Sequence, residues 1–198
     1  MSNLKESKTY INLAKAYAGE CQARVRYEFL EYGARQGGLV AMANLVAKVV
    51  FNEFNHARML YTFIQTATDA TISNIDIATG YPFKEKWNIL DNLRLATENE
   101  KDEAELIYPE YAKIAEKEGF KDIAGLFKNL AAVETSHKLL FQDLYEQLKS
   151  GAMYKKTKKT LWRCGDCGHE SNLEQAPAIC PLCQAKQGTV LIKTDVMV

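Results

Sequence analysis

The sequence predicts a mainly α-helical protein, in which a four-helix bundle is followed by a small metal-bound domain of strands and loops. Apolar residues recur with the helical period over the first 150 residues, and four of the five cysteines lie in the last fifth of the 198-residue chain. The composition excludes a wholly disordered or collagen-like chain, because 47% of the residues are hydrophobic and 25% are charged.

Four apolar stripes at helical spacing define the expected helices. They cover residues 13–31, 39–63, 90–111 and 126–148. Gly37-Gly38 separates the first two stripes, and Glu118-Gly119 precedes the fourth. Residues 66–85 form one long connection, which is typical of the ferritin-like variant of the four-helix bundle. We therefore assign residues 1–152 to a ferritin-like bundle.

The apolar stripes carry acidic residues and histidines in mid-helix, where an unpaired buried charge is costly. Two Glu-x-x-His pairs place each glutamate and histidine on one helical face. The seven candidate metal ligands are Glu20, Glu53, His56, Glu100, Glu103, Glu134 and His137. Five carboxylates and two imidazoles suit two Fe or Mn ions better than one Zn. The sequence therefore predicts a dinuclear redox site inside the bundle.

Two tyrosines lie on the same stripes as these ligands. Tyr27 is two turns beyond Glu20, and Tyr108 is two turns beyond Glu100. Each can donate a hydrogen bond to a ligating carboxylate, or it can be a core tyrosine whose hydroxyl is satisfied elsewhere. Cys21 follows a predicted ligand, but its side chain points about 100° away on a helix, and we assign it no role.

Cys164, Cys167, Cys180 and Cys183 form two Cys-x-x-Cys motifs separated by 12 residues. Together they supply a tetrahedral four-thiolate site that suits Zn or Fe, and the spacing does not distinguish the two metals. Residues 161–198 are too few to fold by apolar burial alone, so a structural metal is expected there. His169 is expected at the surface, and the Lys-rich residues 153–160 are expected to be a linker.

Several classes of function are disfavoured by charge and hydropathy. The formal net charge is zero, so no global basic field draws the chain to nucleic acid or anionic lipid. The longest apolar tract, residues 39–51, is interrupted by Asn44 and Lys48 and is shorter than a membrane helix of about 20 residues. The N-terminus lacks the pattern of a signal peptide, so we expect a cytoplasmic protein.

On these motifs the chain resembles the rubrerythrin family over essentially its whole length. The most specific element is the Glu-x-x-Glu of Glu100 and Glu103 followed by Tyr108-Pro109, since simpler ferritin-like proteins lack the additional carboxylate. Ala176-Pro177 ahead of Cys180-Pro181 also fits the rubredoxin-like part of the family. One departure is Thr97-Glu98-Asn99, where the family commonly has a small residue. Glu98 offers an alternative ligand register, about 200° from Glu100 around the helix.

The resemblance implies a role for each candidate ligand. Glu53 and Glu134 bridge two irons, Glu20 and Glu103 bind one iron, and Glu100 and His137 bind the other. A redox-dependent exchange of a carboxylate for a histidine falls on Glu103 and His56. The four cysteines hold a third iron, for which Zn is a possible substitute.

The function implied by the resemblance is peroxide scavenging in protection against oxidative stress. The diferrous site reduces hydrogen peroxide to water, and the rubredoxin-like centre supplies electrons one at a time. No dinucleotide or phosphate-binding glycine motif is present, so NAD(P)H is expected to act through a separate reductase or rubredoxin. The family is usually a homodimer or larger.

Three rival functions stay open from the sequence. The first is a ferritin-like ferroxidase or iron-storage protein, against which the additional carboxylate Glu103 argues. The second is a zinc-ribbon binding module carried on a helical assembly bundle. The third is an O2-activating hydroxylase, which needs an apolar substrate cavity.

Overall fold

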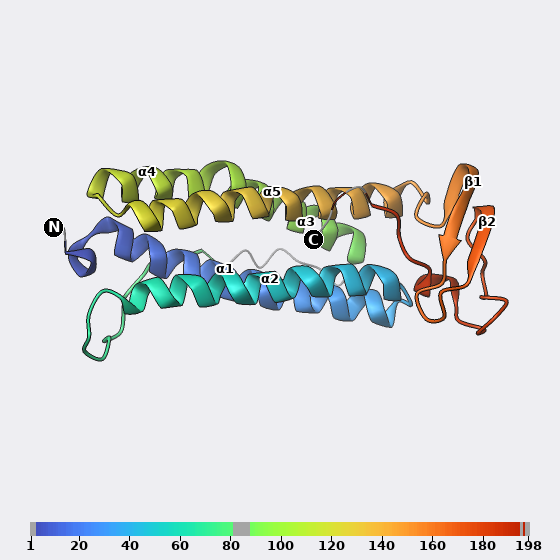
Figure 1. Cartoon of the computed structure of the whole chain (residues 1–198), viewed down its shortest axis with the longest axis horizontal. Coiled ribbons are helices and arrows are strands. Elements are labelled where there is room, and N and C mark those ends of the chain that lie inside the picture. The colour runs from blue at the N-terminus through green and yellow to red at the C-terminus, as the bar shows by residue number, and fades with distance from the viewer. Residues whose placement is uncertain (1–2, 81–87, 195, 197–198) are drawn as a thin grey trace.

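The computed structural model describes residues 3–80, 88–194 and 196. It confirms the predicted fold class, because four long helical rods lie side by side and a small two-stranded domain sits at one end of them (Figure 1). The first rod is α1 (Lys8–Gln36) and the second is α2 (Val40–Gln65). The fourth is α5 (Lys121–Lys149). No helix within the described ranges is both long and apolar enough to cross a membrane.

The third rod is one helix with an irregular turn, whereas a regular helix was predicted. It consists of α3 (Ile89–Asp102), a π-helical segment η2 (Glu103–Ile107) and α4 (Tyr108–Glu118). In a regular α-helix, Tyr108 would lie about 80° around the axis from Glu100. A π turn takes up about one extra residue, which brings both residues to the inner face, where they are buried.

Two apolar clusters fill the bundle, one toward each end. One contains Leu30, Val46 and Phe141 together with neighbouring residues of α1, α2, α3 and α5. The other contains Leu13 and Phe127 together with residues of α1, α2, α4 and α5. Buried acidic residues and histidines lie along the same helices between the two clusters. The fold therefore places a polar layer inside an otherwise apolar core.

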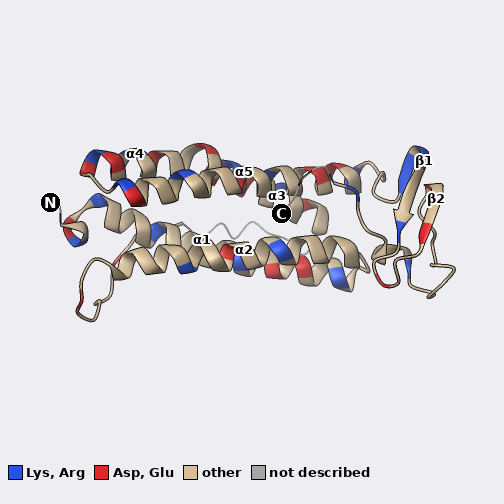
Figure 2. Cartoon of the chain, in the orientation of Figure 1, with Lys and Arg blue, Asp and Glu red and all other residues tan. Residues whose placement is uncertain are grey.

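The small domain is built on two antiparallel strands, β1 (Lys155–Arg163) and β2 (Glu170–Gln175). Trp162 is 2% exposed and donates a hydrogen bond from Nε1 to the Leu173 carbonyl oxygen at 2.9 Å. The Lys-rich residues expected as a linker are structured instead. Residues 155–160 belong to β1, along which lysine and arginine concentrate (Figure 2), and Met153 is buried in the bundle core.

The small domain docks on the end of the bundle nearest the α1–α2 turn. Ile192 joins the apolar cluster of the bundle, and Gln147 of α5 donates a hydrogen bond from Nε2 to the Lys193 carbonyl oxygen at 2.9 Å. Gly188 lies directly against Gly38 of the turn, where a Cβ atom would come within 1.6 Å of the Gly38 carbonyl oxygen. Backbone contact and apolar packing therefore join the two parts.

Candidate metal centres

The carboxylates and histidines of the polar layer form two overlapping groups of potential metal ligands. Glu20, Glu53, His56 and Glu134 make the first group, and Glu53, Glu100, Glu134 and His137 make the second. Within each group, the ligand atoms lie within 4.8 Å of one another. Glu53 and Glu134 belong to both groups, which is the arrangement expected of carboxylates that bridge two ions.

Both histidines direct Nδ1 at the carboxylates. His137 Nδ1 lies 2.7 Å from Glu134 Oε2 and 3.1 Å from Glu53 Oε1. His56 Nδ1 lies 3.0 Å from Glu53 Oε2 and 3.1 Å from Glu134 Oε1. The i, i+3 spacing on α2 and α5 places each histidine beside the glutamate of its own helix, as the sequence pattern predicts.

The donor atoms of the site fit metal ions because most of them lack a partner. Buried atoms without a hydrogen bond include both carboxylate oxygens of Glu134, one oxygen each of Glu20, Glu53 and Glu100, and His137 Nδ1. Leaving such groups buried and unsatisfied is costly. Two cations would satisfy all of them at once, and a set of carboxylates with two imidazoles is typical of iron or manganese.

The ionisation of the site is strongly perturbed. Burial raises the pKa of Glu20 well above its usual value and that of Glu100 to about 8. Burial also opposes ionisation of Glu53, but the nearby imidazoles of His137 and His56 outweigh it and lower the pKa of Glu53 to about 2. Burial disfavours protonated His137, yet its contacts with Glu100, Glu134 and Glu53 raise its pKa to about 12. Without metal ions, bound protons therefore neutralise part of the negative charge of these carboxylates.

The two predicted tyrosines form reciprocal hydrogen bonds between the first and the third helical rods. The Tyr27 hydroxyl of α1 donates to Glu100 Oε1 of α3, and the Tyr108 hydroxyl of α4 donates to Glu20 Oε1 of α1. Burial raises the pKa of both hydroxyls well above the usual value, with the neighbouring carboxylates adding to the shift. Both phenols therefore stay protonated and orient one oxygen of each glutamate.

Glu103 lies at the edge of the site and belongs to neither ligand group. It is half-buried in the π segment and lines a cavity of about 350 Å³ together with Gly19, Tyr108 and Tyr111. His56 takes the place beside Glu20 that the family resemblance gives to Glu103. Among the described residues, the ligand group that contains Glu20 therefore includes His56 and not Glu103.

The remaining residues considered from the sequence lie outside the dinuclear site. Glu98 is exposed and pairs with Arg94 at 2.7 Å, so the ligand register is that of Glu100. Cys21 is half-buried and His169 is partly exposed, and neither belongs to a ligand group found among the described residues. Sequence reasoning missed Asn52, whose Nδ2 lies 3.2 Å from His137 Nε2.

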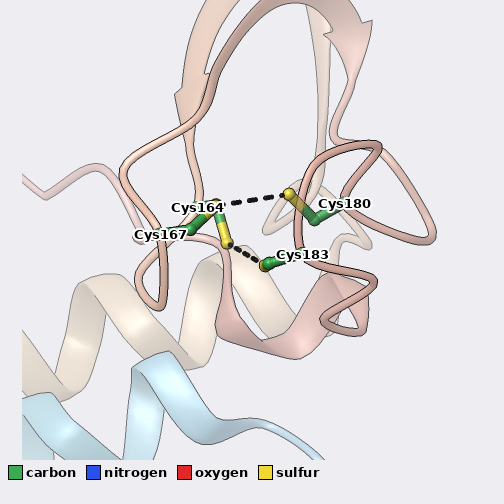
Figure 3. Close-up of side chains that lie close together, drawn as sticks. All are labelled: Cys164, Cys167, Cys180 and Cys183. Carbon is green, nitrogen blue, oxygen red and sulfur yellow. Dashed lines mark hydrogen bonds between the residues drawn. The ribbon is translucent and has the colours of Figure 1, made fainter.

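The four cysteines of the small domain converge from two loops (Figure 3). The sulfur atoms of Cys164 and Cys183 are 3.7 Å apart, and those of Cys167 and Cys180 are 3.6 Å apart. Both separations are far longer than a disulfide bond of about 2.05 Å, and all four thiols are free. This spacing fits four thiolates around one tetrahedral ion.

The two cysteine loops repeat the same backbone geometry. Gly168 N–H donates to the Cys164 carbonyl oxygen and Gln184 N–H donates to the Cys180 carbonyl oxygen, both at 3.0 Å. Gly168 and Gln184 have positive φ values of 75° and 64°. A hydrogen bond from the Cys167 backbone N–H is the main cause that lowers the pKa of Cys164 to about 6. Backbone amides therefore favour the thiolate that a metal requires.

Comparison with known proteins is consistent with both centres. A family model described as Rubrerythrin matches residues 12–145, and one described as Rubrerythrin, rubredoxin-like domain matches residues 162–189. Rubrerythrin of Clostridium perfringens is 38% identical over 183 residues, which cover 92% of this chain and 93% of that protein. Rubrerythrin of Nitratidesulfovibrio vulgaris is 32% identical over 183 residues, with the same coverage of each chain.

Solved structures support the fold. Nigerythrin in its mixed-valence state superimposes with a TM-score of 0.62 at 21% identity, covering 98% of this chain and 94% of that chain. A bacterioferritin of Desulfovibrio desulfuricans, whose diiron site was studied in different catalytic states, gives a TM-score of 0.59 at 19% identity and covers 72% of this chain and 81% of that chain. Both likenesses concern the fold alone.

Proposed function

The chain belongs to the rubrerythrin family, and from this premise we propose that it is a non-haem di-iron peroxidase, which reduces hydrogen peroxide to water with electrons relayed through its four-thiolate iron centre. The observation that carries the proposal is the presence of two metal centres of different kind in one chain. A dinuclear carboxylate site can exchange two electrons with a small oxidant, whereas four thiolates close their ion to substrate and suit it to electron transfer.

The proposed reaction balances with two irons in the bundle and one in the small domain. Hydrogen peroxide accepts two electrons and two protons, its O–O bond breaks, and two water molecules form. Two ferrous ions held by the two ligand groups that share Glu53 and Glu134 would supply both electrons. An iron held by the four cysteines would supply one-electron transfer to restore the ferrous state, so the reaction would require an external reductant.

The residues of the chain hold the site in place for this reaction. Glu53 and Glu134 are common to both ligand groups and keep the two positions close. Tyr27 and Tyr108 fix one oxygen each of Glu100 and Glu20. The cavity of about 350 Å³ beside Glu103 offers a small oxidant a route toward the buried ligands. We expect Glu103 and His56 to exchange as ligands when the oxidation state changes.

Electron relay between two subunits is favoured by the length of the bundle. The small domain docks at the α1–α2 turn, close to the start of α2 at Val40. Glu53 lies 13 residues further along α2, which corresponds to about 20 Å at 1.5 Å per residue. In a homodimer or larger oligomer, the small domain of one subunit can approach the bundle of another more closely. The electron donor to the small domain would be a separate reductase or a rubredoxin.

Anaerobic mixing tests the proposal. Protein isolated without added metals is reduced and mixed rapidly with hydrogen peroxide or with air-saturated buffer, while the ferric-thiolate absorption of the small domain is followed. Peroxidase function predicts that the band returns much faster with peroxide than with air. Faster oxidation by air, with mineral loading on added ferrous iron, would favour ferroxidase and storage. A small domain that holds Zn and does not accept Fe would favour the binding module.

A further inference from the structure

The dinuclear site is anchored unequally on its two sides, and we propose that Asn52 is the cause. Asn52 is a positioning residue that holds His137 as a permanent ligand, whereas the corresponding position on α5 is Val133, which cannot hydrogen-bond His56 and leaves it free to change its ligation. This inference rests on the di-iron site and not on the choice of peroxide as oxidant.

The contact of Asn52 is with the ring nitrogen of His137 that faces away from the carboxylates. The Asn52 Nδ2 to His137 Nε2 distance is 3.2 Å, while His137 Nδ1 faces Glu134 and Glu53. When Nδ1 binds a metal, the proton of the neutral imidazole is on Nε2, so the Asn52 amide must be turned over, with Oδ1 in the place of Nδ2 as the acceptor. Such a hydrogen bond fixes both the tautomer and the orientation of a ligating histidine.

An approximate twofold relation makes the difference between the two histidines clear. Glu53 and His56 on α2 correspond to Glu134 and His137 on α5, and the Tyr27–Glu100 bond corresponds to the Tyr108–Glu20 bond.

In this relation, the residue before Glu53 corresponds to the residue before Glu134. Asn52 is therefore matched by Val133, whose side chain has no hydrogen-bonding group.

The environment of the two rings differs in the same direction. His137 is fully buried, whereas the His56 side chain is 11% exposed. No side chain in the described part of the structure forms a hydrogen bond with His56 Nε2, and the described hydrogen bond and ion pairs of His56 all involve Nδ1. Among the described residues, carboxylates are the only polar partners of this ring, so it can leave its position when they rearrange. His137 has a further contact with Asn52, on the side of the ring that faces away from the carboxylates.

Three variants test the role of Asn52 without using peroxide. The apo-protein is loaded with Co²⁺ alone, and the shifted, exchangeable ring N–H signals of bound histidines are followed by NMR. In parallel, loss of Co²⁺ to excess EDTA is timed. We expect one slowly exchanging ring N–H in the wild type. In Asn52→Leu, this signal should exchange rapidly and one phase of Co²⁺ loss should be about 10–100-fold faster.

Asn52→Asp and Asn55→Leu are the matched variants. Aspartate accepts from Nε2–H, so Asn52→Asp should retain the slow signal. Asn55 lies on the same helix but bonds the Phe51 carbonyl oxygen, so Asn55→Leu should behave as wild type. Wild-type exchange and Co²⁺ loss in Asn52→Leu would overturn the proposal. So would an Asn52→Asp protein that loses the slow signal, which also decides the matter if Asn52→Leu does not fold.

The converse variant is Val133→Asn, which supplies the missing acceptor on the other side of the site. We expect a second slowly exchanging ring N–H, from His56, and slower loss of Co²⁺ from the first ligand group. An unchanged number of slow signals would show that position 133 does not correspond to Asn52. A failure of the peroxide reaction would leave all of these results unaffected, so the two proposals fail separately.

Discussion

Replacing Gly188 by alanine should loosen the small domain from the bundle. The added methyl group would lie 1.6 Å from the Gly38 carbonyl oxygen, whereas Cβ atoms essentially never approach other atoms within 3.0 Å. The two segments must therefore separate by at least 1.4 Å. The obstructing atoms are backbone, so no flexible side chain can yield. Overpacking of this kind costs about 1–3 kcal/mol.

The separation can be measured by amide hydrogen exchange of residues 36–42 and 186–194. A cost of about 1–3 kcal/mol corresponds to roughly 5–150-fold faster exchange by local opening. Gly125→Ala is the matched control, because it lies in α5 and its Cβ would meet nothing within 4 Å. Unchanged exchange in Gly188→Ala, or equal acceleration in both variants, would refute the described docking.

Three further predictions concern the helical bundle and the two metal centres. Tyr108→Phe should weaken ferrous iron binding about 10–100-fold, measured by competition with a chelator, because the Glu20 carboxylate loses its buried donor. Glu118→Gln should destabilise the protein by roughly 1 kcal/mol near pH 7, since Glu118 accepts hydrogen bonds from Thr9 N–H and Oγ1 at the start of α1. These bonds hold the pKa of Glu118 below its usual value. The stability that they add is therefore present above about pH 4.5 and is lost as the pH falls through the folded pKa. Urea unfolding at several pH values should show that the stabilities of the variant and the wild type converge in acid. Removal of all metal should lower the melting temperature, because the buried carboxylates lose their counter-ions and the small domain loses its central ion; an unchanged melting temperature would contradict the metal assignment.

Much of the fold could be predicted because periodicity records which helix faces are buried. The apolar stripes through Leu13, Val46 and Leu130 predict the helical rods, and the long connection predicts the order in which the rods are joined. The π segment at Glu103–Ile107 could not be predicted, because one extra residue shifts the phase of the stripe once, by about 100°, and leaves the helical period on each side unchanged. The strand at residues 155–160 was missed because lysine runs are usually solvated, whereas here Lys155 and Thr160 pair with β2 on either side of an irregular stretch.

The ligand set was predictable because the chemistry requires carboxylates and histidines on inner helix faces. Its detailed contacts were not, because they depend on how separate helices approach one another. The crossed bonds of Tyr27 and Tyr108 and the contact of Asn52 with His137 all join different helical rods. The position of Glu103 at the edge of the site depends on the same π segment that the periodicity conceals.

The most direct measurement is an anaerobic titration of fully reduced, iron-analysed protein with hydrogen peroxide. With two irons in the bundle and one in the small domain, each chain gives three electrons, so three peroxide molecules should oxidise two chains completely. No O2 should be released, and both centres should end ferric. Oxidation that requires O2, or a four-thiolate centre that stays ferrous while peroxide is consumed, would contradict the proposed peroxidase relay.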